Sequence, residues 1–250
     1  MNMTAIQQER YYRSILLPEV GESGQKKLLQ SSVLIVGAGG LGSPAALYLA
    51  AAGVGNIGLI DADNVDLSNL QRQIIHGTQD IGQPKVISAA DSIRRLNPDI
   101  NTQTWQKNLT SDNARDILKN YQFVIDATDN FSAKFLIAEA CHTMNKAYVH
   151  AGILAFAGQI MTVIPGQTAC YRCIFRDPPP ENLDAVPAGV LGVLPAVVGS
   201  IQATEAVKYL LGIGKLLTNT LLVYDALDMS FRKVELTQDQ TCPVCGNQKG

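Results

Sequence analysis

The sequence predicts an α/β fold, in which a Rossmann-like, mostly parallel sheet carries helices on both faces and continues into antiparallel strands. Three observations predict it. The apolar run at 32–36 leads directly into the glycine-rich turn GAGGLG at 37–42 and a helical stretch to residue 52. Strand-like and helix-like segments then alternate up to residue 151. From Phe156 onward the pattern changes to strand-like pieces, at 158–164, 220–225 and 231–236.

Each earlier element has its own local signal. The polar residues 4–30 are expected to be helical, and the strand at 56–60 ends at Asp61, which completes a βαβ unit of ordinary length. A helix at 85–96 is expected to stop at Asn97-Pro98. The remaining predictions are helices at 111–120 and 132–144 and strands at 123–126 and 147–151.

Composition limits the function classes. The chain has 250 residues, 46% of them hydrophobic, and a net charge of −2 without any charge run, so neither nucleic-acid nor lipid binding is expected. The N-terminus has no secretory pattern, and the uncharged stretches at 31–60 and 185–204 are broken by glycines and prolines. We therefore expect a cytoplasmic protein with no membrane span and one domain over residues 1–250.

The glycine turn predicts a phosphate site. The turn lies between a strand and a helix and contains Gly37, Gly39, Gly40 and Gly42. This arrangement lets a phosphate group approach the free N–H groups at the N-terminus of the helix closely. Asp61, about 20 residues further on, suits the hydroxyl groups of a ribose. This pattern alone fits NAD as well as ATP.

The polar segment that follows Asp61 favours ATP. Arg72 and Lys85 are cations suited to a triphosphate, and Asp129 follows another strand at the same sheet edge, where its carboxylate suits Mg²⁺. A dehydrogenase would instead need an acid–base residue beside a hydride acceptor, and none is obvious. The other cofactor-binding candidates in these segments are Asp63, Ser68, Asn69, Gln73 and Asn130.

Four of the five cysteines form two C-x-x-C pairs, Cys170 with Cys173 and Cys242 with Cys245. Four thiolates suit a closed, tetrahedral, structural Zn²⁺ site. Redox-active dithiols are the rival interpretation, but the surroundings are not thioredoxin-like. Cys141, alone on an apolar helix, is expected to be a small buried hydrophobe.

At this point the chain resembles the ThiF/MoeB/HesA family of E1-like adenylyltransferases, in the ubiquitin-activating superfamily. The resemblance covers essentially the whole chain in order and is specific in its S-N-L-Q-R-Q run and late paired cysteines. The segments that carry it are RYYR (10–13), GAGGLG (37–42), DAD (61–63), LSNLQRQ (67–73), GQPK (82–85), TDN (128–130), CYRC (170–173) and CPVCG (242–246).

The resemblance implies a homodimeric enzyme that uses ATP and Mg²⁺ to adenylate a small ubiquitin-like sulfur carrier ending in Gly-Gly. Thiamine and molybdenum-cofactor synthesis both remain open as its pathway. It also implies N-terminal helices at 1–30, a nucleotide-binding half at 31–155 and a carrier-binding half with zinc at 156–250. Arg13 would reach the partner's site, and the remaining contacts to ATP or its metal would come from Gly40, Asp61, Asn69, Arg72, Lys85 and Asp129.

One departure from the family pattern narrows the expected activity. Many relatives carry a loop cysteine, whereas here the corresponding residue is Ala185 or the loop is shortened, and no cysteine lies between Cys173 and Cys242. We therefore expect adenylation without a covalent carrier–enzyme intermediate from that loop. The alternatives are adenylation of a non-protein carboxylate, as in relatives that dehydrate a tRNA base, an NAD-dependent dehydrogenase, and a non-catalytic scaffold.

Overall fold

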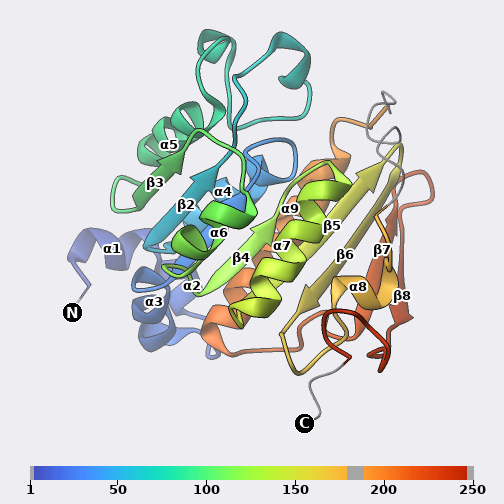
Figure 1. Ribbon diagram of the computed structural model, residues 1–250. Coiled ribbons are helices and arrows are strands. Elements are labelled where there is room, and N and C mark those ends of the chain that lie inside the picture. The colour runs from blue at the N-terminus through green and yellow to red at the C-terminus, as the bar shows by residue number, and fades with distance from the viewer. Residues whose placement is uncertain (1–2, 179–188, 247–250) are drawn as a thin grey trace.

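The computed structural model describes residues 3–178 and 189–246. Within them, eight strands form one sheet in the order β3-β2-β1-β4-β5-β6-β7-β8 (Figure 1). Neighbouring strands pair in parallel from β3 to β5 and antiparallel from β5 to β8, which confirms the expected fold class. The strands are β1 (Ser32–Val36), β2 (Asn56–Ile60), β3 (Asn101–Trp105), β4 (Phe123–Asp126), β5 (Ala147–Leu154), β6 (Ala157–Val163), β7 (Thr220–Asp225) and β8 (Ser230–Glu235).

Helices cover both faces of the sheet, because side chains alternate along each buried strand. In β1, Val33 and Ile35 belong to one core cluster, and Leu34 and Val36 belong to the other. The first cluster includes residues of α3 (Gly21–Leu29), α4 (Gly42–Ala52), α5 (Lys85–Leu96) and α9 (Leu194–Leu211). The second includes residues of α6 (Ser111–Leu118), α7 (Phe131–Thr143) and α8 (Tyr171–Ile174), and α6 and α7 cover the near face in Figure 1.

The sequence did not predict the long helix α9, which lies between the strand-like pieces expected at 158–164 and 220–225. Pro195 stands in the first turn of the helix, where the missing N–H costs nothing, and Gly212 ends it with a positive φ of 75°. Gly199 is required for packing, because a Cβ there would lie 2.3 Å from the carbonyl oxygen of Leu41. The proline and glycines that would be expected to break a helix therefore lie at its start, at its end and at a close packing contact.

One smaller difference has an equally local cause. The edge strand β3 was not predicted because its sequence, NTQTW, is polar and no side chain in it is fully buried. The N-terminal segment forms the helices α1 (Ala5–Arg10), α2 (Tyr12–Ile15) and α3, in agreement with the helices expected there. Across the described residues, no helix has the length and apolar character that a membrane crossing requires.

The parallel strands place their carboxyl ends side by side. Val36 of β1 pairs in register with Ile60 of β2 and Asp126 of β4, and Asp126 pairs with His150 of β5. The chain runs outward from β1 to β2 and β3, then returns to the other side of β1 as β4. This reversal creates a crevice beyond the ends of β1 and β4, which is where open α/β sheets bind ligands.

Candidate active site

A cavity of about 1000 Å³ opens beyond the carboxyl ends of these strands. Its wall includes the last residues of β1 and β2, residues 127–130 between β4 and α7, the start of α7 and part of β5. Ten of the residues selected from the sequence line it, although the first and the last of them are 93 positions apart in the chain. They are Gly37, Gly39, Gly40, Asp61, Asp63, Arg72, Gln73, Lys85, Asp129 and Asn130.

The glycine turn needs its glycines for two close approaches. Gly37 has a φ of +100°, and a Cβ there would lie 2.6 Å from the carbonyl oxygen of Ala127, just after β4. A Cβ on Gly42 would lie 2.0 Å from the carbonyl oxygen of Gly37. Gly42 therefore closes the turn from within and does not itself line the cavity.

Asp61 ties the turn to the end of β2. Its Oδ2 accepts a hydrogen bond of 2.8 Å from the backbone N–H of Ala38, and its Oδ1 accepts one of 2.9 Å from that of Asp63. Each carboxylate oxygen has a second lone pair. Asp61 thus stabilises the turn and keeps acceptor capacity toward the cavity for the ribose contact that the sequence predicts.

Two cations face the same space. The Lys85 Nζ lies 2.8 Å from Asp63 Oδ2, with the lysine side chain 8% exposed and the aspartate 69% exposed. A guanidinium N–H of Arg72 donates to the carbonyl oxygen of Ser68 over 3.2 Å. These bonds use one of three donors of the ammonium and one of five of the guanidinium, so donors remain for phosphate oxygens.

Other sequence-selected residues have local structural partners. Ser68 and Asn69 lie in the short helix η1 (Leu67–Asn69), where both bond to Asp66, and neither lines the cavity. Asn130 caps α7 by accepting from the N–H of Ala133 over 2.8 Å. Arg13 is exposed on α2 and is not part of the cavity wall. Binding roles for these residues stay predictions.

A buried ion-pair network forms the floor beside Asp129, and the sequence analysis missed it. The Asp126 carboxylate lies 3.3 Å from the Lys134 Nζ and 2.8 Å from His150 Nδ1. Thr128 donates to the same carboxylate through both its N–H and its hydroxyl. Lys134 also donates to the carbonyl oxygens of Thr128 and Ala151.

The electrostatics of this network follow from burial and charge. Burial by itself would raise the pKa of Asp126, but the Lys134 ammonium and the His150 hydrogen bond hold it at about 2. Burial lowers the pKa of His150, and the bond to Asp126 offsets only part of that effect. At neutral pH Asp126 is therefore a carboxylate and His150 is neutral. The sequence did offer one signal for His150, its position at the end of a predicted buried strand.

The cavity changes character along its length. Near the glycine turn its wall is polar, whereas at β5 it includes Gly152 and Ile153 together with the rings of Tyr171 and Phe175. The Tyr171 and Phe175 rings lie 4.7 Å apart, and the His150 ring is 4.6 Å from that of Tyr171. One end of the cavity is therefore suited to bind phosphate groups, and the other end is lined by aromatic side chains.

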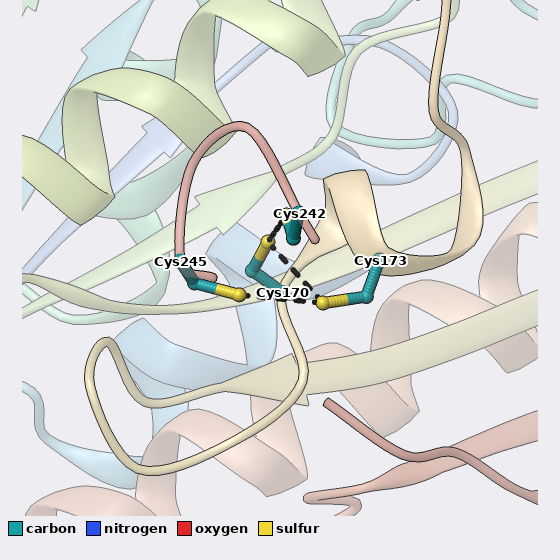
Figure 2. A group of neighbouring side chains, drawn as sticks. All are labelled: Cys170, Cys173, Cys242 and Cys245. Atoms are coloured by element: carbon teal, nitrogen blue, oxygen red, sulfur yellow. Dashed lines mark hydrogen bonds between the residues drawn. The ribbon is translucent and has the colours of Figure 1, made fainter. Parts of the chain in front are cut away.

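The four paired cysteines come together as expected, on the α8 side of the sheet (Figure 2). All four Sγ atoms lie within 4.8 Å of one another, and three contacts measure 3.8, 3.5 and 3.3 Å. A tetrahedral ion with Zn–S bonds of about 2.3 Å needs sulfur atoms roughly 3.8 Å apart. The donor set therefore fits one Zn²⁺ with no open position, and Cys141 is buried elsewhere in the core.

Further contacts hold the cysteine cluster in place. The backbone N–H of Asp239 donates to Cys173 Sγ over 3.4 Å, and Arg176 pairs with the Asp239 carboxylate at 2.7 Å. The Arg176 guanidinium holds the pKa of Asp239 at about 2. The C-terminal segment is thus fixed to the chain beyond α8. Ala185, where the loop cysteine would stand, lies outside the described residues.

Comparison with known proteins shows the family of the chain. A family model described as "ThiF family" matches residues 11–244. The chain is 46% identical to the sulfur carrier protein adenylyltransferase of Thermus thermophilus and 45% identical to the SAMP-activating enzyme E1 of Haloferax volcanii. The matches cover 99% and 98% of this chain and 94% and 92% of the relatives. They confirm the expected class of enzyme, an adenylyltransferase.

Solved structures share the fold. Escherichia coli MccB, bound to MccA-N7isoASN, superposes with a TM-score of 0.83 at 23% identity, covering 98% of this chain and 76% of that one. PaaA superposes with a TM-score of 0.80 at 26% identity over 95% of this chain and 76% of that one. The family model over residues 11–244 and the sequence relatives show that the chain belongs to the ThiF family.

Proposed function

We propose that this chain uses ATP and Mg²⁺ to adenylate the C-terminal Gly-Gly carboxylate of a small ubiquitin-like sulfur carrier. The observation that carries the proposal is the convergence of the glycine turn, Arg72, Lys85 and Asp129 on one cavity at the reversal of strand order. Support also comes from the Thermus relative, which is named for adenylating a sulfur carrier protein.

The proposed reaction is a displacement at the α-phosphorus of ATP. The carrier carboxylate forms a new C–O–P linkage while the bond from the α-phosphorus to pyrophosphate breaks, so no enzyme nucleophile is required. The chain contributes position and charge. Lys85 and Arg72 stabilise the phosphate oxygens, and the exposed Asp129 carboxylate is suited to hold the Mg²⁺ that would neutralise the leaving pyrophosphate.

The aromatic end of the cavity supports a peptide tail as the second substrate. The cavity volume is at the upper end of the range for small-molecule sites, so ATP leaves room for more. An extended Gly-Gly tail is thin enough to run past Phe175 and along β5 toward the phosphates, while the body of the carrier stays outside.

Two further parts of the proposal concern assembly. A structural Zn²⁺ held by the four cysteines would tie the C-terminal segment to the middle of the fold. A homodimer would use Arg13, which is exposed on α2, to add a third cation to the partner's phosphates.

We also propose that adenylation proceeds without an enzyme thioester or acyl-disulfide, because no cysteine lies between Cys173 and Cys242.

The test is ATP–pyrophosphate exchange with purified carriers ending in Gly-Gly. Exchange should depend on both ATP–Mg²⁺ and a matching carrier, and should vanish when the last glycine of the carrier is deleted. Mass spectrometry of the same mixture should show no thiol-sensitive carrier–enzyme adduct. Exchange driven by a small carboxylate but by no carrier would favour the non-protein alternative and contradict the proposal.

A further inference from the structure

His76 lies beneath the glycine turn and has no role in the site described above. It is 7% exposed and bridges two elements through its two ring nitrogens. Nδ1 lies 2.8 Å from the Ser88 hydroxyl on α5, and Nε2 lies 2.9 Å from the carbonyl oxygen of Ala38 in the turn. His76 therefore connects the turn to the helix that begins with Lys85.

The partners of His76 fix its tautomer. A carbonyl oxygen only accepts hydrogen bonds, so Nε2 must carry a proton to bond to Ala38. Burial lowers the pKa of His76, so the ring is neutral near pH 7 and Nδ1 is an acceptor. The Ser88 hydroxyl then donates to Nδ1. The ring thus presents one defined donor to the turn.

The position of Ala38 determines where the next N–H points. The N–H of Ala38 bonds to Asp61 and its carbonyl bonds to His76, so both peptide groups that flank it are held. The described residues contain no cis peptide, and in a trans peptide the C=O and N–H point in opposite directions. With the Ala38 carbonyl directed at buried His76, the N–H of Gly39 points away from the histidine.

That N–H points toward a site without a protein acceptor. Gly39 lines the cavity whereas Ala38 does not. Over residues 3–178 and 189–246, the backbone N–H groups of Gly39 and Gly40 donate to no protein group. Gly40 is also in the cavity wall, one residue before Leu41, which is the N-cap of α4. Such unpaired donors at a helix N-terminus form an anion site.

We infer that His76 is a positioning residue, which holds the Ala38 carbonyl so that the Gly39 N–H faces a phosphate oxygen of ATP. The inference rests on the proposed use of ATP. Without the Nε2 donor, the Ala38–Gly39 peptide is free to rotate, and the donor that meets the phosphate is no longer held in place. The affinity for adenosine, which lacks phosphate, should not change.

Two substitutions separate the ring nitrogens. His76→Gln places an amide nitrogen near the position of Nε2 and keeps a donor for Ala38, whereas His76→Asn reaches only the position of Nδ1. Calorimetric titration with ATP–Mg²⁺ should show about tenfold weaker binding for His76→Asn. His76→Gln should bind within about threefold of the wild type, and both variants should bind adenosine as the wild type does.

The outcomes distinguish this inference from the proposed function. Equal ATP affinity in His76→Asn and wild type, or equal losses for ATP and adenosine, would overturn the positioning role alone. A wild type that does not bind ATP–Mg²⁺ would overturn both. Imidazole ¹⁵N spectra of the wild type give a test that needs no variant to fold: a proton on Nε2 is expected, and a proton on Nδ1 alone would refute the role.

Discussion

The Lys134 ammonium lies 3.3 Å from both oxygens of the Asp126 carboxylate, and both side chains are almost fully buried. The pair joins the end of β4 to the fourth residue of α7, on either side of Thr128 and Asp129. Because Lys134 also bonds to the carbonyl oxygens of Thr128 and Ala151, one charged group fixes the backbone on which the proposed magnesium ligand stands.

Replacing Lys134 by Met should strongly destabilise the fold. The substitution leaves Asp126 buried with only neutral partners, and such losses cost about 3–5 kcal/mol. Urea unfolding measures the change. Lys26→Met is the matched control, because Lys26 pairs with Glu22 at 3.4 Å on the surface and should cost less than about 1 kcal/mol. Similar costs for the two variants would show that the buried pair contributes little.

Replacing Asp129 by Asn should abolish activity and leave the fold intact. Asp129 is exposed in the cavity, so loss of its charge removes a ligand for Mg²⁺ without leaving a buried charge unpaired. Exchange of pyrophosphate into ATP should fall by at least about 100-fold, while the urea midpoint stays near that of the wild type. Asp112→Asn, at an exposed position on α6, is the control. Activity within a few-fold of wild type would remove Asp129 from the proposed metal site.

Sequence reasoning found the parts of the site that depend on local signals. The six-residue glycine turn directly follows a strand rich in β-branched residues. Its first and last glycines are necessary because a Cβ at either position would clash with a backbone carbonyl group. The C-x-x-C pairs could also be recognised from the sequence, because each pair lies within one four-residue segment. Arg72 and Lys85 were found because polar residues after a parallel strand must collect at one sheet edge.

The missed features depend on packing between distant segments. The partnership of Asp126, Lys134 and His150 requires the register of β4 with β5 and the position of α7 over both. No periodic pattern in the sequence predicts this register or this helix position. Helix α9 was not predicted because a glycine such as Gly199 normally weakens a helix. In the structure Gly199 instead lets the helix pack closely against Leu41. His76 was overlooked because only the folded turn reveals its two partners.

Removal of one cysteine of the cluster should release the metal. Metal analysis of the wild type should find about one zinc per chain, and Cys242→Ser should bind little, with a clearly lower melting temperature. Cys141→Ala is the control, because Cys141 is equally buried but stands outside the cluster, so it should keep its zinc. A wild-type protein that is fully folded without metal would contradict the assignment.

Stability should fall as the pH drops below about 6.5, because the fold disfavours protonated histidine. Burial lowers the pKa of His76, His142 and His150 from the ordinary value. In that range the unfolded chain binds more protons than the folded one, so the free energy of unfolding decreases with falling pH. The buried His150 contributes at most about 1.4 kcal/mol per pH unit. Asp126, whose pKa is about 2 in the folded chain, adds to this slope only below about pH 5, where the carboxyl group of the unfolded chain begins to bind protons.

Urea unfolding at pH 7.5 and pH 5.5 measures this effect. His150→Asn is the informative variant, because an asparagine amide at the position of Nδ1 can still donate to Asp126 but does not titrate. The loss of stability between the two pH values should therefore be smaller in His150→Asn than in the wild type. An equal loss would show that His150 takes up its proton in the folded state at its ordinary pKa, and that the buried network imposes no cost on its charge.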